Sequence, residues 1–254
     1  MIQYAQLSPS QLPCREVNKT QFVGRVTDLI GSSLDGSKKG PQAFLVEQSA
    51  NWSLPTHFHE EHQFQVFVNG SGALGNRPIS PFEVHYASPH TGYGPLVAGK
   101  GGVSYLTLRA MSDTGAWYLP ESRARNLRVP KMNAHASPET PIEALDLSLL
   151  IESTIESLIR PHGNGLAAWM MKIKRGQPVL LPTGSEHGGG RFLVVCKGSL
   201  IMGQHVIGCP GVIWLDPQDE VQADAGSEGV ALIVLQFPSE ALQSFRLEHF
   251  PSPT

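Results

Sequence analysis

Residues 56–70 read THFHEEHQFQVFVNG and decide the fold class of this chain. His57 and His59 stand one residue apart, and an apolar run that ends at Gly70 follows them. Because alternate side chains of a β-strand share a face, the two imidazoles would point the same way, about 7 Å apart along the strand. Two imidazoles on one face can chelate a divalent metal if further ligands arrive from other strands. With ten histidines in the chain, a chance pair at the surface is the competing interpretation.

A second copy of the apolar part of this segment begins at Val194, as the first begins at Val66. The aligned pairs are residues 66–75 (VFVNGSGALG) with 194–203 (VVCKGSLIMG), and residues 98–109 (AGKGGVSYLTLR) with 225–236 (AGSEGVALIVLQ). Such a repeat predicts two related halves, each in the size range of one domain. We therefore expect an N-terminal domain over residues 1–135 and a C-terminal domain over residues 136–254.

Composition and turn residues predict an all-β protein. Hydrophobic residues make up 41% of the chain and charged residues 16%, which is enough apolar material for a folded core. The 26 glycines and 20 prolines separate short runs that are apolar or β-branched. Residues 142–159 are the one long segment with helical character. They predict a short linking helix near residues 141–160, or a helix that runs into the first strand of the second half.

Charge and cysteine content exclude several function classes. The net charge of −3 gives no broad basic face for nucleic acid. No apolar stretch is long enough to span a bilayer, and residues 1–30 lack a basic-then-apolar signal pattern. Three cysteines without metal-ligand spacing fit free thiols in a reducing cytoplasm. The expected partner is a small-molecule ligand, with neither nucleic acid nor membrane.

The motif resembles that of the cupin family, whose members are small antiparallel β-barrels of the jelly-roll, or double-stranded β-helix, type. The cupin motif is a glycine, five residues, His-x-His, three or four residues, a glutamate, six residues and a glycine. The last four defined positions of this motif correspond to His57, His59, Gln63 and Gly70, while Asn51 replaces the leading glycine. Because both halves carry the pattern, the resemblance implies a bicupin, with two tandem barrels in one chain.

The resemblance also implies a metal. Cupins bind a divalent ion such as Fe, Mn, Ni or Zn through two histidines, the glutamate and a later histidine. This implies a metal at His57, His59 and Gln63, where the neutral amide would hold the ion less tightly than a carboxylate. The later histidine is absent from its usual place. His85, on the strand leading into that turn, is the expected fourth ligand; the alternative is a histidine hydrogen-bonded within the barrel.

Four further residues are candidates for contact with a substrate. The later histidine position falls on Gly94 or Tyr93, and the Tyr93 phenol could act as an acid or base. His90 lies in the expected turn at the barrel mouth and is the second catalytic candidate, with an exposed turn residue as the alternative. Gln65 shares a strand face with Gln63 and would point into the same cavity. His62 would reach that cavity if its loop curls inward; otherwise it is solvated.

The second half lacks the ligand set. Its residues at the matching positions of His57, His59, Gln63 and His85 are Ser185, His187, Arg191 and Ile213. One imidazole beside an arginine does not make a metal site, because the arginine repels the cation. We therefore expect a structural or dimer-forming C-terminal barrel.

Two function classes remain open. The first is a metal-dependent enzyme acting on a small organic molecule, such as a dioxygenase, an isomerase or a lyase. The second is a non-catalytic cupin that binds a small acid or sugar, with no metal or with a structural one. A clear fourth histidine would favour the enzyme. Cupins commonly pair through sheet edges, so a homodimer is the expected assembly unless the two halves already satisfy each other.

Overall fold

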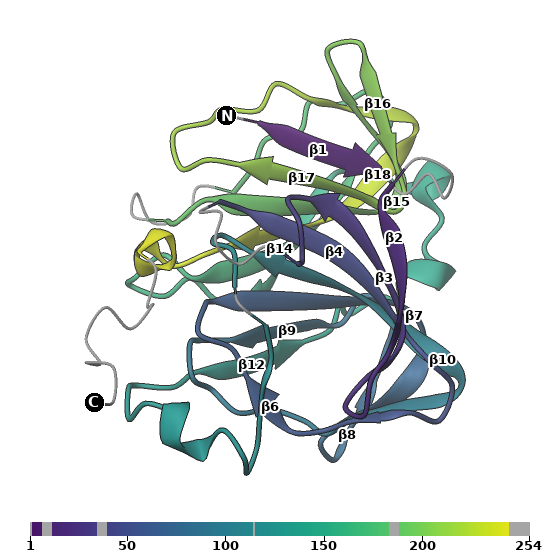
Figure 1. Cartoon of the computed structure of the whole chain (residues 1–254). Helices are drawn as coiled ribbons and strands as arrows, with labels where there is room; N and C mark the ends of the chain where they lie inside the picture. The colour runs from purple at the N-terminus through teal and green to yellow at the C-terminus, as the bar shows by residue number, and fades with distance from the viewer. Residues whose placement is uncertain (1, 7–11, 35–39, 114, 183–187, 244–254) are drawn as a thin grey trace.

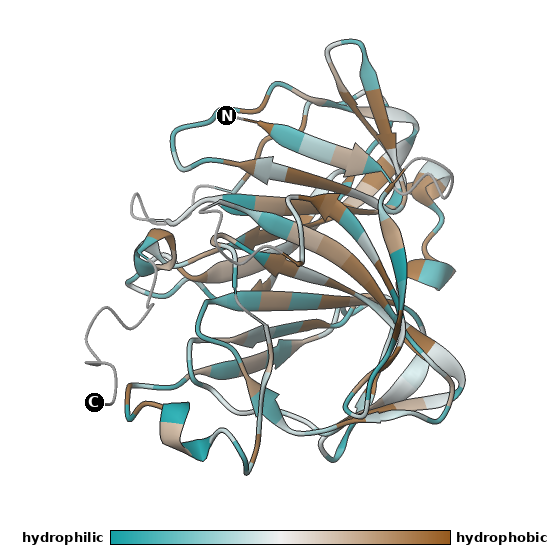
Figure 2. Cartoon of the chain, viewed as in Figure 1, coloured by the Kyte–Doolittle hydropathy of each residue, from teal (hydrophilic) through white to brown (hydrophobic). Residues whose placement is uncertain are grey.

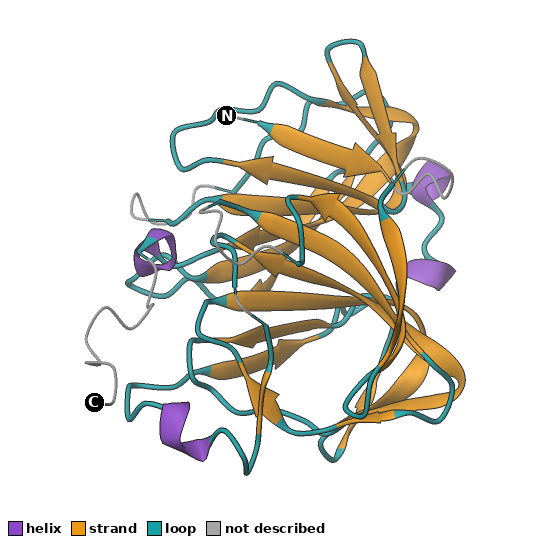
Figure 3. Cartoon of the chain, viewed as in Figure 1, coloured by secondary structure: helices purple, strands orange, loops and turns teal. Residues whose placement is uncertain are grey.

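The computed structural model describes residues 2–6, 12–34, 40–113, 115–182 and 188–243 (Figure 1). These residues form β-strands and short 3-10 helices, and none of them lies in an α-helix (Figure 3). The all-β prediction is therefore confirmed. None of the described helices is long and apolar enough to cross a membrane.

The first half forms a nine-stranded antiparallel sheet in the order β12-β9-β7-β10-β4-β3-β2, with β5 and β8 attached to β10 and β7. A separate two-stranded sheet joins β6 to β11. The strands are β2 (Cys14–Asn18), β3 (Val23–Ile30), β4 (Gln42–Gln48), β5 (Ser53–Leu54), β6 (His57–Phe58), β7 (Gln63–Leu74), β8 (Arg77–Ile79), β9 (Val84–Ala87), β10 (Leu96–Arg109), β11 (Trp117–Tyr118) and β12 (Asn133–Ala136).

The second half forms a seven-stranded antiparallel sheet in the order β1-β17-β15-β18-β14-β13, with β16 attached to β15. The strands are β1 (Gln3–Gln6), β13 (Thr154–Ile159), β14 (Ala167–Ile173), β15 (Arg191–Met202), β16 (His205–Gly208), β17 (Gly211–Leu215) and β18 (Asp224–Gln236). The 3-10 helices are η1 (Arg123–Arg125), η2 (Ile142–Ala144), η3 (Leu147–Leu149) and η4 (Ser239–Leu242).

The two sheets repeat one topology, as the sequence repeat predicts. The central order β9-β7-β10-β4-β3 of the first sheet matches β17-β15-β18-β14-β13 of the second. The outer place that β12 fills beside β9 is filled in the second sheet by β1, beside β17 (Figure 1). Residues 3–6 were expected in the first barrel, and they instead pair with the second. The expected division between residues 135 and 136 falls inside β12, and the strands of the two sheets are instead separated between β12 and β13.

Alternation along the strands builds three hydrophobic clusters. On β7, Phe64 and Val66 point into a cluster shared by the two sheets, while Phe67 points into the interior of the first barrel. On β15, Leu193 and Val195 fill the interior of the second barrel. Both faces of the central strands are therefore buried, and Figure 2 shows brown hydrophobic bands on these strands, interrupted by hydrophilic ones. The inter-sheet cluster holds the two barrels together.

The segment predicted to be a linking helix is two single 3-10 turns, η2 and η3, followed by the edge strand β13. The α-helix prediction near residues 141–160 is wrong, although the expected run into the first strand of the second half begins at Thr154. Ile142 and Leu147 are buried in the inter-sheet cluster, whereas Ile151 is exposed. Backbone hydrogen bonds to β14 hold β13 as an edge strand. These tertiary contacts override the helical pattern of its side chains.

Phe64→Ala should test the inter-sheet cluster. The Phe64 ring is fully buried and lies 4.9 Å, centroid to centroid, from both Tyr86 and Phe237. We expect the substitution to lower the free energy of unfolding by about 3–5 kcal/mol. Urea denaturation followed by tryptophan fluorescence measures this.

Val206→Ala is the matched control, since Val206 is 62% exposed, and its free energy of unfolding should change by less than about 0.5 kcal/mol. We expect a single unfolding transition for the whole chain. Two transitions, with the second barrel unaffected by Phe64→Ala, would contradict the shared cluster.

Candidate functional site

The first barrel encloses a cavity of about 340 Å³. Its polar end is formed by His57, His59, Gln63, Gln65, Tyr93 and Arg109. Its walls combine apolar residues, which are Val17, Phe22, Val26, Phe44, Val46, Leu54 and Tyr105, with polar ones, which include Arg15, Lys19, Ser33 and Thr107. Gln63 and Gln65 reach the cavity because they alternate on β7 with residues that face the other sheet. This cavity thus lies inside the first barrel.

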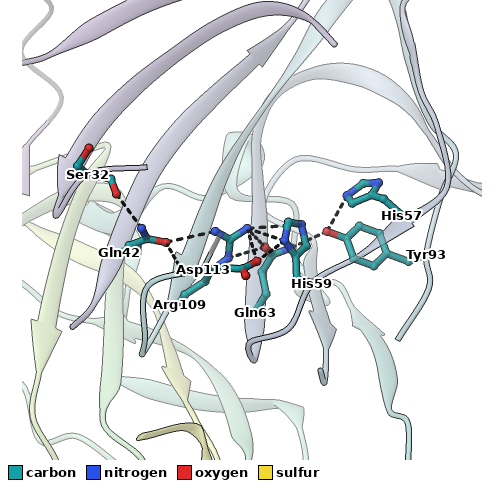
Figure 4. A network of polar contacts seen from close by, with 8 residues as sticks. All are labelled: Ser32, Gln42, His57, His59, Gln63, Tyr93, Arg109 and Asp113. Carbon is teal, nitrogen blue, oxygen red and sulfur yellow. Dashed lines mark hydrogen bonds and ion pairs between the residues drawn. The ribbon is translucent and has the colours of Figure 1, made fainter. Parts of the chain in front are cut away.

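A directional chain of hydrogen bonds runs across the polar end (Figure 4). Arg109 Nε and Nη2 donate to Gln63 Oε1 at 2.9 and 2.7 Å. Gln63 Nε2 then donates to the Tyr93 hydroxyl at 2.6 Å, and that hydroxyl donates to His57 Nε2 at 3.1 Å. His57 Nδ1 lies 2.8 Å from the carbonyl oxygen of Pro55 and must carry the proton, because a carbonyl only accepts. Each link of this chain therefore joins a donor to an acceptor.

His59 is held by a carboxylate. Its Nδ1 lies 2.5 Å from Asp113 Oδ2 and 3.1 Å from Arg109 Nη2. An ionised carboxylate can only accept, so Nδ1 carries the proton and cannot accept a hydrogen bond from the guanidinium. The second ring nitrogen, Nε2, is therefore an acceptor, and His59 lines the cavity.

Arg109 is a buried cation, with 4% of its surface exposed. Its Nη1 donates to Gln42 Oε1 at 3.2 Å, and its Nη2 lies 3.8 Å from Asp113 Oδ2. Gln42 Oε1 also accepts from the Asp113 amide, and Gln42 Nε2 donates to the Ser32 carbonyl at 2.7 Å (Figure 4). These contacts compensate the burial of the charge.

Sequence reasoning missed Arg109, Asp113 and Gln42. The available signal was a charged residue at the end of the apolar run 103–108, with an acidic residue four positions later. An arginine that continues the inward-facing register of a buried strand has to be paired.

Burial keeps the histidines of the site neutral. Together with the smaller effect of the neighbouring His59, it lowers the pKa of His57 to about 3. Burial and the Arg109 charge also lower the pKa of His59, against the opposing effect of Asp113. Burial raises the pKa of the Tyr93 phenol, which stays protonated. At neutral pH these states match the hydrogen-bond directions given above.

His85, the expected fourth ligand, hydrogen-bonds residues other than His57, His59 and Gln63, although its ring centroid lies 4.7 Å from that of Tyr93. Its Nδ1 lies 2.8 Å from Gln65 Oε1 and its Nε2 lies 3.1 Å from Asn133 Oδ1. Its ring stacks on His135, with the centroids 4.6 Å apart. The structure thus gives His85 the role of a histidine bonded within the barrel. Gln65 lines the cavity as expected and orients His85.

His90 and His62 lie outside this cavity. His90 is buried in a left-handed backbone conformation, with φ at 59°, and its ring lies 5.5 Å from the Phe58 ring. His62 Nδ1 lies 2.6 Å from the Tyr86 hydroxyl. It lines a second cavity of about 320 Å³ between the barrels, together with Asn164 and Glu240. Of the two catalytic candidates, only Tyr93 belongs to the site.

The second barrel shows the same register with different residues. Arg191 stands opposite Gln236, so the cross-strand pair of Gln63 and Arg109 is present with its two residues exchanged. Ala167, Leu193 and Ile213 take the register positions of Gln42, Gln65 and His85. The interior is filled by an apolar cluster. Ser185 and His187, named in the sequence comparison, lie outside the described residues.

The residues at the polar end do not fit a divalent metal in this arrangement. Within the described part of the chain, no group of three or more His, Cys, Asp or Glu side chains is placed to hold an ion. The oxygen of Gln63 is occupied by Arg109, and His57 Nε2 is occupied by Tyr93. A guanidinium within 3.4 Å of His59 Nε2 also repels a second cation.

No family model and no curated protein sequence matches this chain. Solved structures do resemble it. A candidate dioxygenase from Nostoc punctiforme has a TM-score of 0.60 at 12% identity, covering 99% of this chain and 87% of that one. A bacterial pirin from Escherichia coli, in complex with nickel(II), has a TM-score of 0.56 at 8% identity, covering 94% and 99%. AerE from Microcystis aeruginosa has a TM-score of 0.56 at 15% identity, covering 92% and 98%.

Tyr93→Phe should destabilise the protein. It removes the hydroxyl that links Gln63 Nε2 to His57 Nε2 and leaves both atoms without that partner. We expect a loss of about 1–3 kcal/mol in the free energy of unfolding. Tyr4→Phe is the control, since Tyr4 is 43% exposed, and it should have almost no effect. Equal effects of the two substitutions would argue against the hydrogen-bond chain.

Acid should weaken the fold through the buried histidines. Burial lowers the pKa values of both His57 and His85 to about 3. The unfolded chain binds these protons near pH 6.5, so stability is complete above that pH and falls as the pH drops toward 3. Each histidine contributes a slope of up to about 1.4 kcal/mol per pH unit.

Urea midpoints measured from pH 7.5 to 4.5 test this acid sensitivity. His57→Asn should flatten the profile, whereas His205→Asn, at an exposed position, should leave it unchanged. A wild-type profile without slope below pH 6.5 would contradict the burial argument.

Proposed function

We propose that this protein, a two-barrel chain with the cupin fold, binds a small organic acid in its N-terminal barrel. Arg109 is the cation that meets the carboxylate. The observation that carries the proposal is a buried guanidinium at the end of a ligand-sized cavity. Its hydrogen bonds to Gln63 and Gln42 use one N–H on each of its three nitrogens, out of the five that a guanidinium carries.

The walls of the cavity support an apolar body for this acid. Phe22, Phe44 and Tyr105 supply aromatic surface around a volume within the usual range for small-molecule sites. Lys19 and Arg15 also line the cavity and add positive charge, although Arg15 is already paired with Asp28 at 3.4 Å. An aromatic carboxylic acid satisfies both the polar end and the walls.

The pair of His59 and Asp113 supports a reaction as well as binding. A carboxylate on Nδ1 leaves Nε2 unprotonated on His59, a residue that lines the cavity, and Nε2 is then the candidate base. An acid bound at Arg109 would present its neighbouring carbon to this base, since Arg109 Nη2 lies 3.4 Å from His59 Nε2. Proton transfer of this kind belongs to isomerases and lyases.

Isothermal titration with benzoate and phenylacetate, against benzamide and phenylacetamide, tests the proposed binding. We expect the acids to bind and the amides to bind at least about tenfold more weakly. Arg109→Gln should weaken acid binding by about tenfold to a hundredfold, since it removes a charge-assisted hydrogen bond. Arg15→Gln, at the cavity edge, is the matched control and should have a smaller effect. Equal affinity for acids and amides would refute the proposal.

A metal-dependent enzyme, such as a dioxygenase, is the second candidate. It is favoured by the His57 and His59 rings, which lie 5.3 Å apart and nearly perpendicular, and by the nickel(II) complex of the similar pirin. It requires Arg109 to leave Gln63. Elemental analysis of protein purified without chelator tests this second candidate. It predicts about one Fe, Mn, Ni or Zn ion per chain, and the loss of that ion in the His57→Ala/His59→Ala variant.

The compartment is part of the same proposal. Cys14, Cys196 and Cys209 are all free thiols. Free thiols persist where glutathione keeps the surroundings reducing. We therefore assign the protein to the cytoplasm.

A further inference from the structure

We infer that Arg109 takes the place of a divalent cation in the N-terminal barrel, and that removal of its charge uncovers a metal site. A metal at this position would bond Gln63 Oε1 and the Nε2 atoms of His57 and His59. Arg109 Nη2 already lies 2.7 Å from Gln63 Oε1 and 3.4 Å from His59 Nε2. One nitrogen of the guanidinium thus contacts two of the three atoms.

The third atom, His57 Nε2, is already hydrogen-bonded within the same network. His57 Nε2 accepts from the Tyr93 hydroxyl, and Gln63 Nε2 donates to that hydroxyl. The orientation of the Gln63 amide follows from Arg109, because the cation requires the oxygen and so turns the NH₂ group toward Tyr93. Arg109 therefore sets the direction of every hydrogen bond as far as His57.

The local charge is balanced without a metal. Asp113 lies 3.8 Å from Arg109 and 2.5 Å from His59, so its carboxylate already has a cation and a donor. Gln63 brings no charge. A divalent ion added here would meet a buried guanidinium, where the low dielectric makes the repulsion strong. The same residues without Arg109 would instead offer a negative site.

The second barrel indicates which substitution the fold tolerates. Gln236 occupies the register position of Arg109 there, opposite Arg191. Gln236 is fully buried, and its Nε2 donates to the carbonyl of Gly165. Glutamine at this position is therefore compatible with the barrel, and Arg109→Gln removes the charge and shortens the side chain by two atoms, which vacates the place of the guanidinium.

Cobalt titration of four proteins tests the inference: wild type, Gln63→Glu, Arg109→Gln, and Gln63→Glu/Arg109→Gln. Each is purified without a metal-affinity tag, and Co²⁺ binding is followed by visible absorption and by elemental analysis after desalting. We expect the double variant to bind about one Co²⁺ per chain, at least about a hundredfold more tightly than wild type. Gln63→Glu alone should not gain binding, because its new carboxylate pairs with Arg109.

Adding His57→Ala to the double variant should abolish Co²⁺ binding, which places the ion at this site. Circular dichroism and thermal melting confirm that each protein is folded. Tight binding by wild type or by Gln63→Glu alone would overturn the inference, even if the double variant does not fold. A folded double variant that takes up no Co²⁺ would overturn it as well. The cobalt titration does not depend on carboxylate binding. Its outcome therefore stays valid even if the protein binds none of the proposed organic acids.

Discussion

The constraint on which the site depends is the burial of one positive charge. A guanidinium removed from water has to be met by acceptors, or the fold loses several kcal/mol. Arg109 is met by Gln63 from β7, by Gln42 from β4 and, at longer range, by Asp113 beyond the end of β10. Three neighbouring parts of the first barrel thus contact one side chain. The same contacts help to position His59, which is bonded to Asp113, and Tyr93, which is bonded to Gln63.

The two barrels share a topology and differ in what fills them. Inward positions of the second barrel carry aliphatic and aromatic residues, which form a closed apolar cluster. Three of these register positions, those of Ala167, Leu193 and Ile213, carry Gln42, Gln65 and His85 in the first barrel. Polar side chains at these places need partners and room, so the first barrel keeps a cavity. The second barrel contributes one wall of the inter-sheet cluster, with Phe192, Trp214 and Phe237.

Much of this arrangement follows from sequence patterns with a simple physical basis. Alternation on β7 predicts that Gln63 and Gln65 face the barrel interior, and both do. The spacing of His57 and His59 predicts neighbouring rings, and these lie 5.3 Å apart. Tyr93 lines the same cavity, and its catalytic role stays a prediction. The prediction of a linking helix was wrong because helix propensity contributes less than the pairing of β13 with β14. The expected place of residues 3–6 in the first barrel was wrong because packing, and not the local sequence, sets which strand β1 pairs with.

The sequence by itself determined the two-barrel organisation, the all-β class and the inward side of each central strand, because repeats and alternation are local properties of the chain. Only the tertiary structure decided what the inward residues do. Arg109 and Gln63 are 46 residues apart, and Gln42 is 67 residues from Arg109. No local pattern encodes such a pairing. It arises when antiparallel strands align in register and the barrel excludes water. The buried charge is then hydrogen-bonded by whichever acceptors lie beside it on the neighbouring strands.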